Sequence, residues 1–267
     1  MIDLKQGDCL ELMKEMGNKS VDLILCDLPY GVTQNKKDKV INLKLLWLEY
    51  KRVIKDRGII ILTTQQPFTT DLINSERKLF RYDLIWNKEL ISGFLNANRQ
   101  PLRVHESILI FYKKLGTYNP QFEIGKPLHS KGINYKTNKH INNNYGKFEI
   151  KDDKRAGTKQ KYPKSILKFK KTHPSCCLHP TEKSLELFEY LIKTYSNKND
   201  LVLDNCMGSG TTGLACKNLN RNFIGIELDE KYFDIAKKRI ESCEKQQILR
   251  GARQFKLEQN SKRVLQR

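Results

Sequence analysis

Four consecutive residues, Asp27-Leu28-Pro29-Tyr30, bring together a carboxylate, a constrained backbone and an aromatic ring. They follow the apolar run Val21–Cys26, which predicts a buried strand that ends at Asp27. Open α/β sheets bind ligands at the carboxyl ends of their strands. A carboxylate that accepts a hydrogen bond, beside a ring that stacks on a base, suits chemistry on a planar amino group. On this segment alone, an ordinary strand-ending turn explains the residues equally well.

The second segment that could do chemistry is the glycine-rich stretch Leu201–Gly213. It predicts a strand, a sharp turn and the start of a helix, and its glycines would let the backbone approach a ligand closely. The spacing Gly208-x-Gly210-x-x-Gly213 satisfies the dinucleotide-binding fingerprint, and Glu227 ends the next predicted strand, where it can accept hydrogen bonds from ribose hydroxyls. The segment therefore indicates a nucleoside cofactor, and an NAD enzyme is the first interpretation to test.

The position of this segment in the chain argues against a dehydrogenase. Only 40 residues follow Glu227, and they predict one good helix and no clear strand. A dinucleotide fold needs several more strands, which can come only from the N-terminal half. We therefore expect a permuted sheet, in which the cofactor-binding unit is encoded last and lies beside the strand that ends at Asp27. Asp8, after a short N-terminal strand, would fall near the same crevice.

The elements that must position these residues alternate between strands and helices, both before residue 112 and after residue 174. This alternation predicts an α/β fold with a mostly parallel, twisted sheet and helices on both of its faces. The predicted strands are Ile2–Lys5, Val21–Asp27, Gly58–Thr63, Tyr82–Trp86, Ser107–Tyr112, Leu201–Asp204 and Asn222–Glu227. The predicted helices are Leu43–Lys55, Pro67–Arg77, Thr181–Ile192 with Thr181 as its N-cap, and Asp229–Ile240.

Composition predicts a cytoplasmic protein with one α/β domain that carries an insertion. The chain has 267 residues and 39% hydrophobic content, which is enough for one large core. No apolar run approaches the ~20 residues that span a bilayer, and the N-terminus lacks the apolar region of a signal peptide. The seven cysteines lack the regular spacing of a disulfide framework. We therefore expect no membrane partner.

Positive charge is concentrated in the middle of the chain. The formal net charge is +19, and residues 113–173 contain 16 Lys and Arg against 4 Asp and Glu. Tyrosine and phenylalanine side chains are interleaved with these lysines, so the segment could hold phosphates and stack on bases. Nucleic acid is the polyanion that such a segment fits. A lysine-rich surface that serves only solubility is the alternative.

With both motifs in view, the chain resembles the amino-group DNA methyltransferases that use S-adenosylmethionine, in their permuted β-class order. Asp27-Leu28-Pro29-Tyr30 is similar to the Asp-Pro-Pro-Tyr catalytic motif, and residues 204–213 to the Asp-x-Phe-x-Gly-x-Gly cofactor loop. Asn222–Glu227 is similar to the ribose-binding strand. Gly7-Asp8-Cys9 and His179-Pro180-Thr181-Glu182-Lys183 resemble two further cofactor segments, and His105–Leu109 resembles a recurrent strand of this class.

The resemblance implies a Rossmann-like methyltransferase fold, circularly permuted, and a set of cofactor contacts. Leu28 replaces the first Pro of the catalytic motif, with little expected effect because the family uses the backbone carbonyl there. Cys206 replaces the usual Phe of the cofactor loop, which removes a packing contact with the cofactor. The implied cofactor residues are Asp8, Cys9, Thr181, Lys183, Asp204, Cys206, Gly208, Gly210, Thr211, Thr212 and Glu227.

The implied reaction is methyl transfer to an exocyclic amine, which is a poor nucleophile because its lone pair is delocalised into the ring. Asp27 and the Leu28 carbonyl would accept the two amine hydrogens, Pro29 would fix the carbonyl, and Tyr30 would stack on the base. The base must be flipped out of the duplex to reach this site. Asp at position 27, rather than Ser, favours adenine N6 over cytosine N4.

The same resemblance predicts how the chain is divided. Residues 1–112 and 174–246 would form the methyltransferase domain, residues 113–173 a basic target-recognition insertion, and residues 247–267 a basic tail. Double-stranded DNA is the expected partner, and a homodimer and a restriction endonuclease of the same system are compatible with it. The expected DNA contacts come from composition: Lys126, Lys154 and Arg155 lie in the basic segment, and Arg99 and Arg103 form a polar cluster before the His105 strand, for which a surface loop is the alternative.

Several alternatives stay open at this point. The enzyme could methylate cytosine N4, RNA or a protein amide, and a catalytically inactive DNA-binding protein could keep the same fold. The run His173-x-x-Cys176-Cys177-x-His179 contains four potential zinc ligands. Adjacent cysteines make poor chelate geometry and His179 has a place in the methyltransferase motif, so we expect no metal.

Overall fold

A computed structural model describes residues 1–31, 40–126, 158–171 and 183–242. These residues form two compact units, one built from residues 1–119 and from residue 165 onward, and a smaller one from residues 120–164. The first unit contains an eight-stranded sheet, and the second contains a two-stranded sheet. No helix among the described residues is long and apolar enough to cross a membrane.

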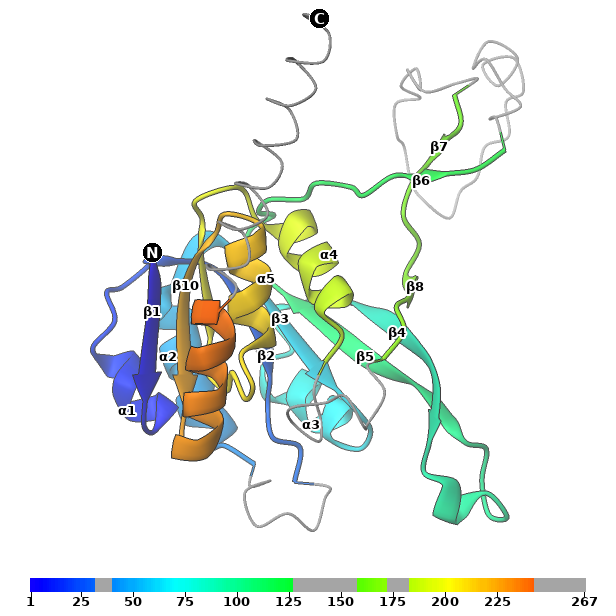
Figure 1. Cartoon of the computed structure of the whole chain (residues 1–267), viewed down its shortest axis with the longest axis horizontal. Helices are drawn as coiled ribbons and strands as arrows, with labels where there is room; N and C mark the ends of the chain where they lie inside the picture. Colours follow the sequence, from blue (N-terminus) through cyan, green and yellow to red (C-terminus); the bar gives the residue numbers. More distant parts are fainter. Residues whose placement is uncertain (32–39, 127–157, 172–182, 243–267) are drawn as a thin grey trace, which may run out of the picture. The chain divides into compact units, whose positions relative to one another are not determined.

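The large sheet is permuted, as the two motifs predicted. Its strand order is β1-β10-β9-β2-β3-β5-β4-β8, so the last two strands of the chain lie between the first two (Figure 1). The pairs from β1 to β3 are all parallel, whereas β5 is antiparallel to both β3 and β4. The strands are β1 (Ile2–Gln6), β2 (Val21–Asp27), β3 (Ile54–Thr64), β4 (Phe80–Ser92), β5 (Arg103–Phe111), β8 (Ile166–Lys168), β9 (Leu201–Asp204) and β10 (Asn222–Glu227).

Two apolar layers form because the central strands are apolar at nearly every position. Successive side chains point to opposite faces, so Leu23 and Leu25 of β2 join one core while Ile24 and Cys26 join the other. A strand buried on both faces reads as a continuous apolar run, as expected for a parallel sheet with helices on both sides.

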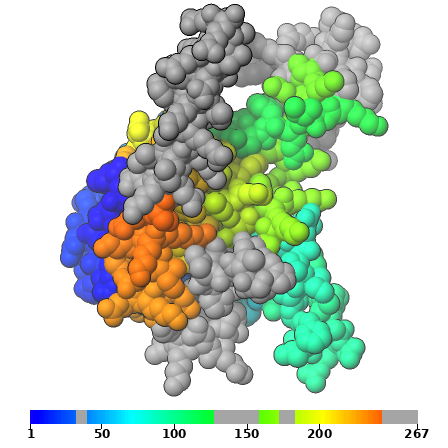
Figure 2. Space-filling view, viewed as in Figure 1, coloured from blue at the N-terminus to red at the C-terminus, as the bar shows by residue number. Residues whose placement is uncertain are grey.

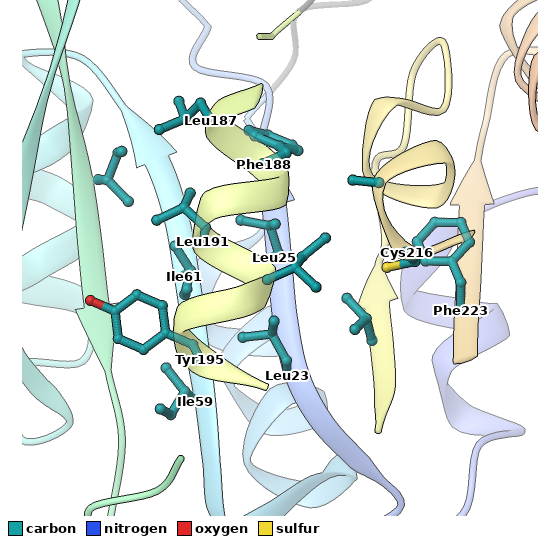
Figure 3. Close-up of a cluster of buried hydrophobic side chains, with 14 of the residues drawn as sticks. Leu23, Leu25, Ile59, Ile61, Leu187, Phe188, Leu191, Tyr195, Cys216 and Phe223 are labelled. Atoms are coloured by element: carbon teal, nitrogen blue, oxygen red, sulfur yellow. The ribbon is translucent and has the colours of Figure 1, made fainter. Parts of the chain in front are cut away.

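The first layer contains α4 (Leu185–Tyr195), α5 (Thr211–Asn218) and helical residues 230–242. In α4 the buried residues Leu187, Phe188, Leu191 and Tyr195 recur at helical spacing and lie against strand residues such as Leu25 and Ile61 (Figure 3). The N-cap of α4 is Ser184, so the prediction of a helix that starts after Thr181 was wrong at that end. The predicted end at Ile192 was one turn too early.

The second layer contains α1 (Cys9–Lys14), α2 (Leu43–Val53) and α3 (Phe68–Ser75). The α2 helix starts at Asn42, whose side chain accepts a hydrogen bond from the Leu45 N–H. It buries Leu46, Trp47, Tyr50 and Val53 against the sheet. The helix was predicted from apolar residues that included Leu45 and Leu48, and these two are exposed.

The strands β4 and β5 are longer than predicted because they continue past the edge of the sheet as a hairpin. Their pairing extends to Ser92 and Arg103, and a short 3₁₀ helix η1 (Phe94–Asn96) forms the turn. At the carboxyl end of β3, Thr64 pairs with Ser107 of β5, so the hairpin projects from the sheet edge at which β2 ends with Asp27 (Figure 1). In the smaller unit, β6 (Glu123–Ile124) pairs with β7 (Gln160–Lys161).

Candidate active site

The Asp27 carboxylate lies at the carboxyl end of β2, opposite Thr63 of the neighbouring strand β3. The Thr63 hydroxyl donates a hydrogen bond to Oδ1 of Asp27 at 2.5 Å, and the Tyr30 hydroxyl donates to the same oxygen at 2.5 Å. The Tyr30 ring in turn stacks on Phe68 of α3, with 5.7 Å between ring centroids. The motif therefore folds back on itself, so that acid and ring occupy one site.

A buried lysine is the third partner of Asp27, as an ion pair. The Nζ of Lys183 lies 3.1 Å from Oδ1 of Asp27 and 2.7 Å from Oε2 of Glu106 on β5. The other oxygen of Glu106 is 3.1 Å from Nζ of Lys88 on β4. Lys88, Glu106 and Lys183 are each less than 9% exposed. Four charges of alternating sign thus extend from the sheet interior to the catalytic carboxylate.

Of these charges, Glu106 and Lys183 favour the ionised state of each other, whereas burial lowers the pKa of Lys88. Burial by itself would raise the pKa of Glu106, but Lys183 and Lys88 outweigh it and lower that pKa to about 2. Burial would lower the pKa of Lys183, but Asp27 and Glu106 raise it well above the usual value. Burial and the Asp27 charge raise the pKa of Tyr30 well above its usual value, so its hydroxyl keeps its proton.

The two hydrogen bonds and the ion pair leave one side of the Asp27 carboxylate open to a further donor. Tyr30, Thr63 and Lys183 all contact Oδ1, and no described residue donates a hydrogen bond to Oδ2. A carboxylate oxygen can accept about two hydrogen bonds. Oδ2 is therefore the acceptor that this site can offer to the amino group of a substrate.

The glycine turn after β9 is shaped by backbone that only glycine adopts easily. Gly208 and Gly210 have φ values of 50° and 79°. A Cβ on Gly210 would lie 2.9 Å from Cβ of Ala236, so the helix at residues 230–242 packs directly on the turn. Arg239 of that helix donates hydrogen bonds to the Ser209 carbonyl at 3.2 Å and to the Thr211 hydroxyl at 3.1 Å. Thr211 therefore serves to fix the turn.

Two carboxylates anchor this turn to the ends of β9 and β10. Glu227 accepts a hydrogen bond from the Gly208 N–H at 2.8 Å and one from the Asp229 N–H at 2.9 Å. Asp204 accepts one from the Cys206 N–H at 3.1 Å and one from the Thr212 hydroxyl. Burial raises the pKa of Asp204 to about 7, despite those two hydrogen bonds. The turn and both carboxylates lie at the same sheet edge as Asp27.

Two N-terminal residues predicted to contact a cofactor have clear structural roles. Asp8 is the N-cap of α1, and its carboxylate accepts hydrogen bonds from the Leu10 N–H at 2.8 Å and the Glu11 N–H at 3.3 Å. Cys9 is buried, and its thiol interacts with Cys206.

Cys206, which replaces the Phe of the family motif, lies between two other thiols. Hydrogen bonds with Cys26 and Cys9 raise the pKa of Cys206 well above its usual value. All three cysteines are free thiols. A small side chain fits here because the neighbouring positions are also small and polarizable.

The predicted DNA-binding residues fall in separate places. Arg99 is exposed just after η1. Arg103 lies at the base of the hairpin, with its guanidinium group beside Gly93, where an added Cβ would be 3.8 Å from it. Lys126 is exposed in the smaller unit. Outside the described residues lie Thr181, Lys154, Arg155 and the candidate zinc ligands His173, Cys176, Cys177 and His179.

Sequence reasoning missed three residues of the Asp27 cluster. Thr63 was visible only as the last residue of a predicted strand, and Glu106 as part of a strand of the resembling family. Lys88 carried a usable signal, because it occupies an inward position in the strand alternation Leu84, Trp86, Lys88. A buried lysine must have a charged partner. Lys183 was expected beside a cofactor. Among the residues that the structure describes, it contacts Asp27, Glu106 and Tyr30.

Comparison with known proteins agrees with this geometry. Residues 21–238 match the family described as DNA methylase (N6_N4_Mtase). The Type II methyltransferase M.HinfI of Haemophilus influenzae is 30% identical over 88% of the chain and 67% of its own length. M1.MboII of Moraxella bovis is 30% identical over 87% of the chain and 94% of its own length. The DNA adenine methyltransferase YhdJ of Escherichia coli is 29% identical over 88% of the chain and 81% of its own length.

Solved structures show the same fold. The M1.HpyAVI–SAM complex is 31% identical, with a TM-score of 0.58 over 90% of this chain and 100% of that one. The cytosine-N4-specific PvuII DNA methyltransferase, at 16% identity and a TM-score of 0.61 over 89% of this chain and 86% of that one, shares the fold. With its family match spanning most of the chain and its permuted sheet, this protein belongs to the S-adenosylmethionine-dependent N6/N4 DNA methyltransferases.

Proposed function

We propose that this enzyme transfers a methyl group from S-adenosylmethionine to the N6 atom of adenine in duplex DNA. The observation that carries the proposal is the Asp27 carboxylate, whose Oδ1 accepts hydrogen bonds from Tyr30 and Thr63 and pairs with Lys183, while Oδ2 is open at the sheet edge that also bears the glycine turn. The name of the E. coli relative, a DNA adenine methyltransferase, supports the choice of base.

The residues of the cofactor segment fit S-adenosylmethionine. Gly208 and Gly210 have the positive φ values that let backbone approach a ligand, and Glu227, at the end of β10, carries the acceptor oxygens that ribose hydroxyls need. Among the residues proposed to hold it are Asp8, Thr181, Asp204 and Cys206. S-adenosylmethionine supplies an electrophilic methyl group, which the amine nitrogen takes as the carbon–sulfur bond breaks and its electron pair stays on sulfur.

The catalytic residues prepare the amine for this step. Oδ2 of Asp27 and the carbonyl of Leu28 accept the two amine hydrogens, which draws the lone pair out of conjugation with the ring. Pro29 restricts the backbone that carries this carbonyl. Tyr30, already stacked on Phe68, offers its other face to the base. After transfer the nitrogen carries a positive charge, and its proton passes to Asp27 or to water.

DNA binding is assigned to two basic regions. The smaller unit, at residues 120–164, falls within the basic segment 113–173 and contributes Lys126, with Lys154 and Arg155 in the same segment. The β4–β5 hairpin contributes Arg99 and Arg103 and projects from the sheet edge that carries Asp27. Both would hold phosphates while the target base is flipped into the site.

The cellular setting follows from the relatives. M.HinfI and M1.MboII are Type II methyltransferases, which supports a restriction endonuclease partner for this enzyme. A cytoplasmic location is part of this proposal, because the enzyme must reach the DNA that it methylates. A homodimer is compatible with this role.

Cytosine N4 is the second candidate target. The PvuII enzyme, which has the same fold, is cytosine-N4-specific. Cytosine also presents an exocyclic amine with two hydrogens, so the acceptors at Asp27 and Leu28 could serve either base. RNA or protein amide methylation and an inactive DNA-binding role have no comparable support.

One experiment separates these functions. The protein is incubated with methyl-labelled S-adenosylmethionine and duplex DNA of mixed sequence, and the DNA is digested to nucleosides. We expect label in N6-methyl-2′-deoxyadenosine, and none when Asp27→Ala replaces the wild type. Label in N4-methyl-2′-deoxycytidine would move the target to N4. Parallel reactions contain RNA or protein in place of DNA, and label in those alone would reject a DNA substrate. Sequencing of methylated positions in the same DNA would identify the recognition site.

A further inference from the structure

The chain of buried charges behind Asp27 has no role in the reaction as proposed so far. Lys183 precedes α4, Glu106 lies on β5 and Lys88 on β4, so three elements distant in sequence converge on it. Buried charges are costly, and apolar residues of similar size would stabilise a core at least as well. Lysine and glutamate at these positions therefore require a purpose beyond folding.

Geometry connects the chain to one oxygen of the catalytic carboxylate. Nζ of Lys183 lies 2.7 Å from Oε2 of Glu106, 3.1 Å from Oδ1 of Asp27 and 3.3 Å from the Tyr30 hydroxyl. The lysine stem is flexible, and a single partner would not fix its ammonium group. With a carboxylate on each side, the group has one position.

Glu106 is itself held from the far side. Its second oxygen, Oε1, lies 3.1 Å from Nζ of Lys88, which also donates to the Ser92 hydroxyl at 3.4 Å. Lys88 and Glu106 lie on neighbouring antiparallel strands. Each follows one member of the Asn87–His105 pair, so the two residues lie diagonally across that pair. The rigid sheet therefore sets the position of Glu106, and Glu106 sets that of Lys183.

We propose that Lys183 and Glu106 are positioning residues for methyl transfer. Glu106 holds the Lys183 ammonium group, which binds Oδ1 of Asp27 and so turns Oδ2 toward the target amine. This inference rests on the proposed function and reassigns Lys183 from the cofactor to the catalytic carboxylate. In-line transfer depends steeply on geometry, so a displaced acceptor costs rate without costing cofactor affinity.

The test compares Glu106→Gln and Lys183→Met with a matched control on the surface. Lys51, near the end of α2, and Glu76, which follows α3, form an ion pair of 2.7 Å outside the Asp27 cluster, and Glu76→Gln and Lys51→Met are the control variants. Single-turnover methylation is measured with saturating DNA and cofactor, and the Kd of S-adenosylmethionine by calorimetry. We expect both site variants to lose about 10- to 100-fold in rate, with Kd essentially unchanged, and the controls to retain the wild-type rate.

A double-mutant cycle distinguishes an effect of Lys183 through Asp27 from a merely structural role of Lys183. If Lys183 acts through Asp27, Lys183→Met should lower the residual rate of Asp27→Asn no further. A full additional loss in that background would overturn the inference.

Two more outcomes would also overturn it. One is a wild-type methylation rate for Glu106→Gln, a result that can be interpreted even if Lys183→Met does not fold. The other is an equal loss of cofactor affinity and rate in Lys183→Met, which would return Lys183 to the cofactor. A wild-type protein that methylates no nucleic acid would instead reject the proposed function, and this inference with it.

Discussion

At the scale of single residues, the site depends on which oxygen of Asp27 each neighbour occupies. Thr63 is the simplest neighbour to test, because Thr63→Val removes its hydroxyl and keeps its shape. We expect the single-turnover rate to fall about 10-fold, the equivalent of one hydrogen bond to a charged group, while cofactor affinity stays unchanged. Thr63→Ser, which restores the donor, is the control. Equal rates for the Val and Ser variants would show that this hydrogen bond does not orient the carboxylate.

Asp204 leads to a prediction about pH. Its pKa is about 7 in the folded protein and about 3.9 in an unfolded chain. The protonated form is therefore favoured by folding, and the stability that it contributes is present below pH 4 and lost as the pH rises through 7. Asp204→Asn should remove that loss, which amounts to up to about 4 kcal/mol.

The measurement is urea unfolding of both proteins at pH 5 and pH 8. The free energy of unfolding of the wild type should decrease more across this range than that of Asp204→Asn. Glu106 does not interfere, because its pKa of about 2 places its own transition below pH 4.5. Identical pH dependence in the two proteins would mean that Asp204 is not the titrating group.

The residues that sequence could and could not identify differ in how local their signal is. Asp27 to Tyr30 and the glycine turn act through adjacent residues, so their spacing carries the chemistry. Thr63, Glu106 and Lys88 reach Asp27 only through strand pairing and through contacts between distant elements. Sequence periodicity places a residue on a face of its strand but does not give the register between strands.

At the scale of secondary structure, the permuted sheet could be predicted because both motifs must meet at the carboxyl ends of parallel strands. Element ends were less predictable. The α4 helix begins after Ser184 and not after Thr181, although both residue types favour an N-cap. Residue type alone could not choose between them, whereas the packing of Leu187 and Phe188 on the sheet is consistent with a start at Ser184. The extension of β4 and β5 into a hairpin could not be predicted, because it has no apolar core that would leave a pattern in the sequence.

That hairpin gives a prediction about DNA binding. Phe94 and Leu95 at its turn are 74% and 88% exposed, beside Arg99, and the turn stands out from the molecular surface (Figure 2). Exposed apolar side chains next to cations can enter a base stack from which a nucleotide has been flipped. We expect Phe94→Ala with Leu95→Ala to weaken binding to target duplex about 10-fold and to reduce the fluorescence of 2-aminopurine placed at the target position.

The control for the hairpin is Leu48→Ala, since Leu48 is 62% exposed on α2. It should bind and flip as the wild type does. An abasic target nucleotide lowers the cost of flipping and should return part of the affinity lost by the double variant. Wild-type affinity in the double variant on both duplexes would remove the hairpin from the DNA interface.

At the scale of the whole molecule, the uneven charge is the dominant property. Of the net charge of +19, residues 113–173 contribute +12. Each phosphate neutralised by the protein adds about 0.9 to the slope of log affinity against log salt concentration. The position of the positive charge, and not its total alone, should therefore decide how steeply DNA binding depends on salt.

Two variants with the same net charge test this idea. The first changes four lysines of the smaller unit to glutamine, and the second changes four exposed lysines of the large unit that lie away from the Asp27 edge. The two sets are Lys126, Lys159, Lys161 and Lys164, and Lys14, Lys19, Lys55 and Lys198. Binding of a target duplex is titrated between 50 and 300 mM salt for both, with about 0.9 of slope expected per lost contact.

We expect the first variant to lose up to about 4 units of slope and the second to keep the wild-type slope. Three lysines of the second set, Lys14, Lys19 and Lys55, already pair with carboxylates in the structure, so they have less charge to offer a phosphate. Equal slopes in the two variants would mean that net charge alone attracts DNA. A loss of slope confined to the second variant would place the DNA on the large unit, and the smaller unit would then have a function other than DNA binding.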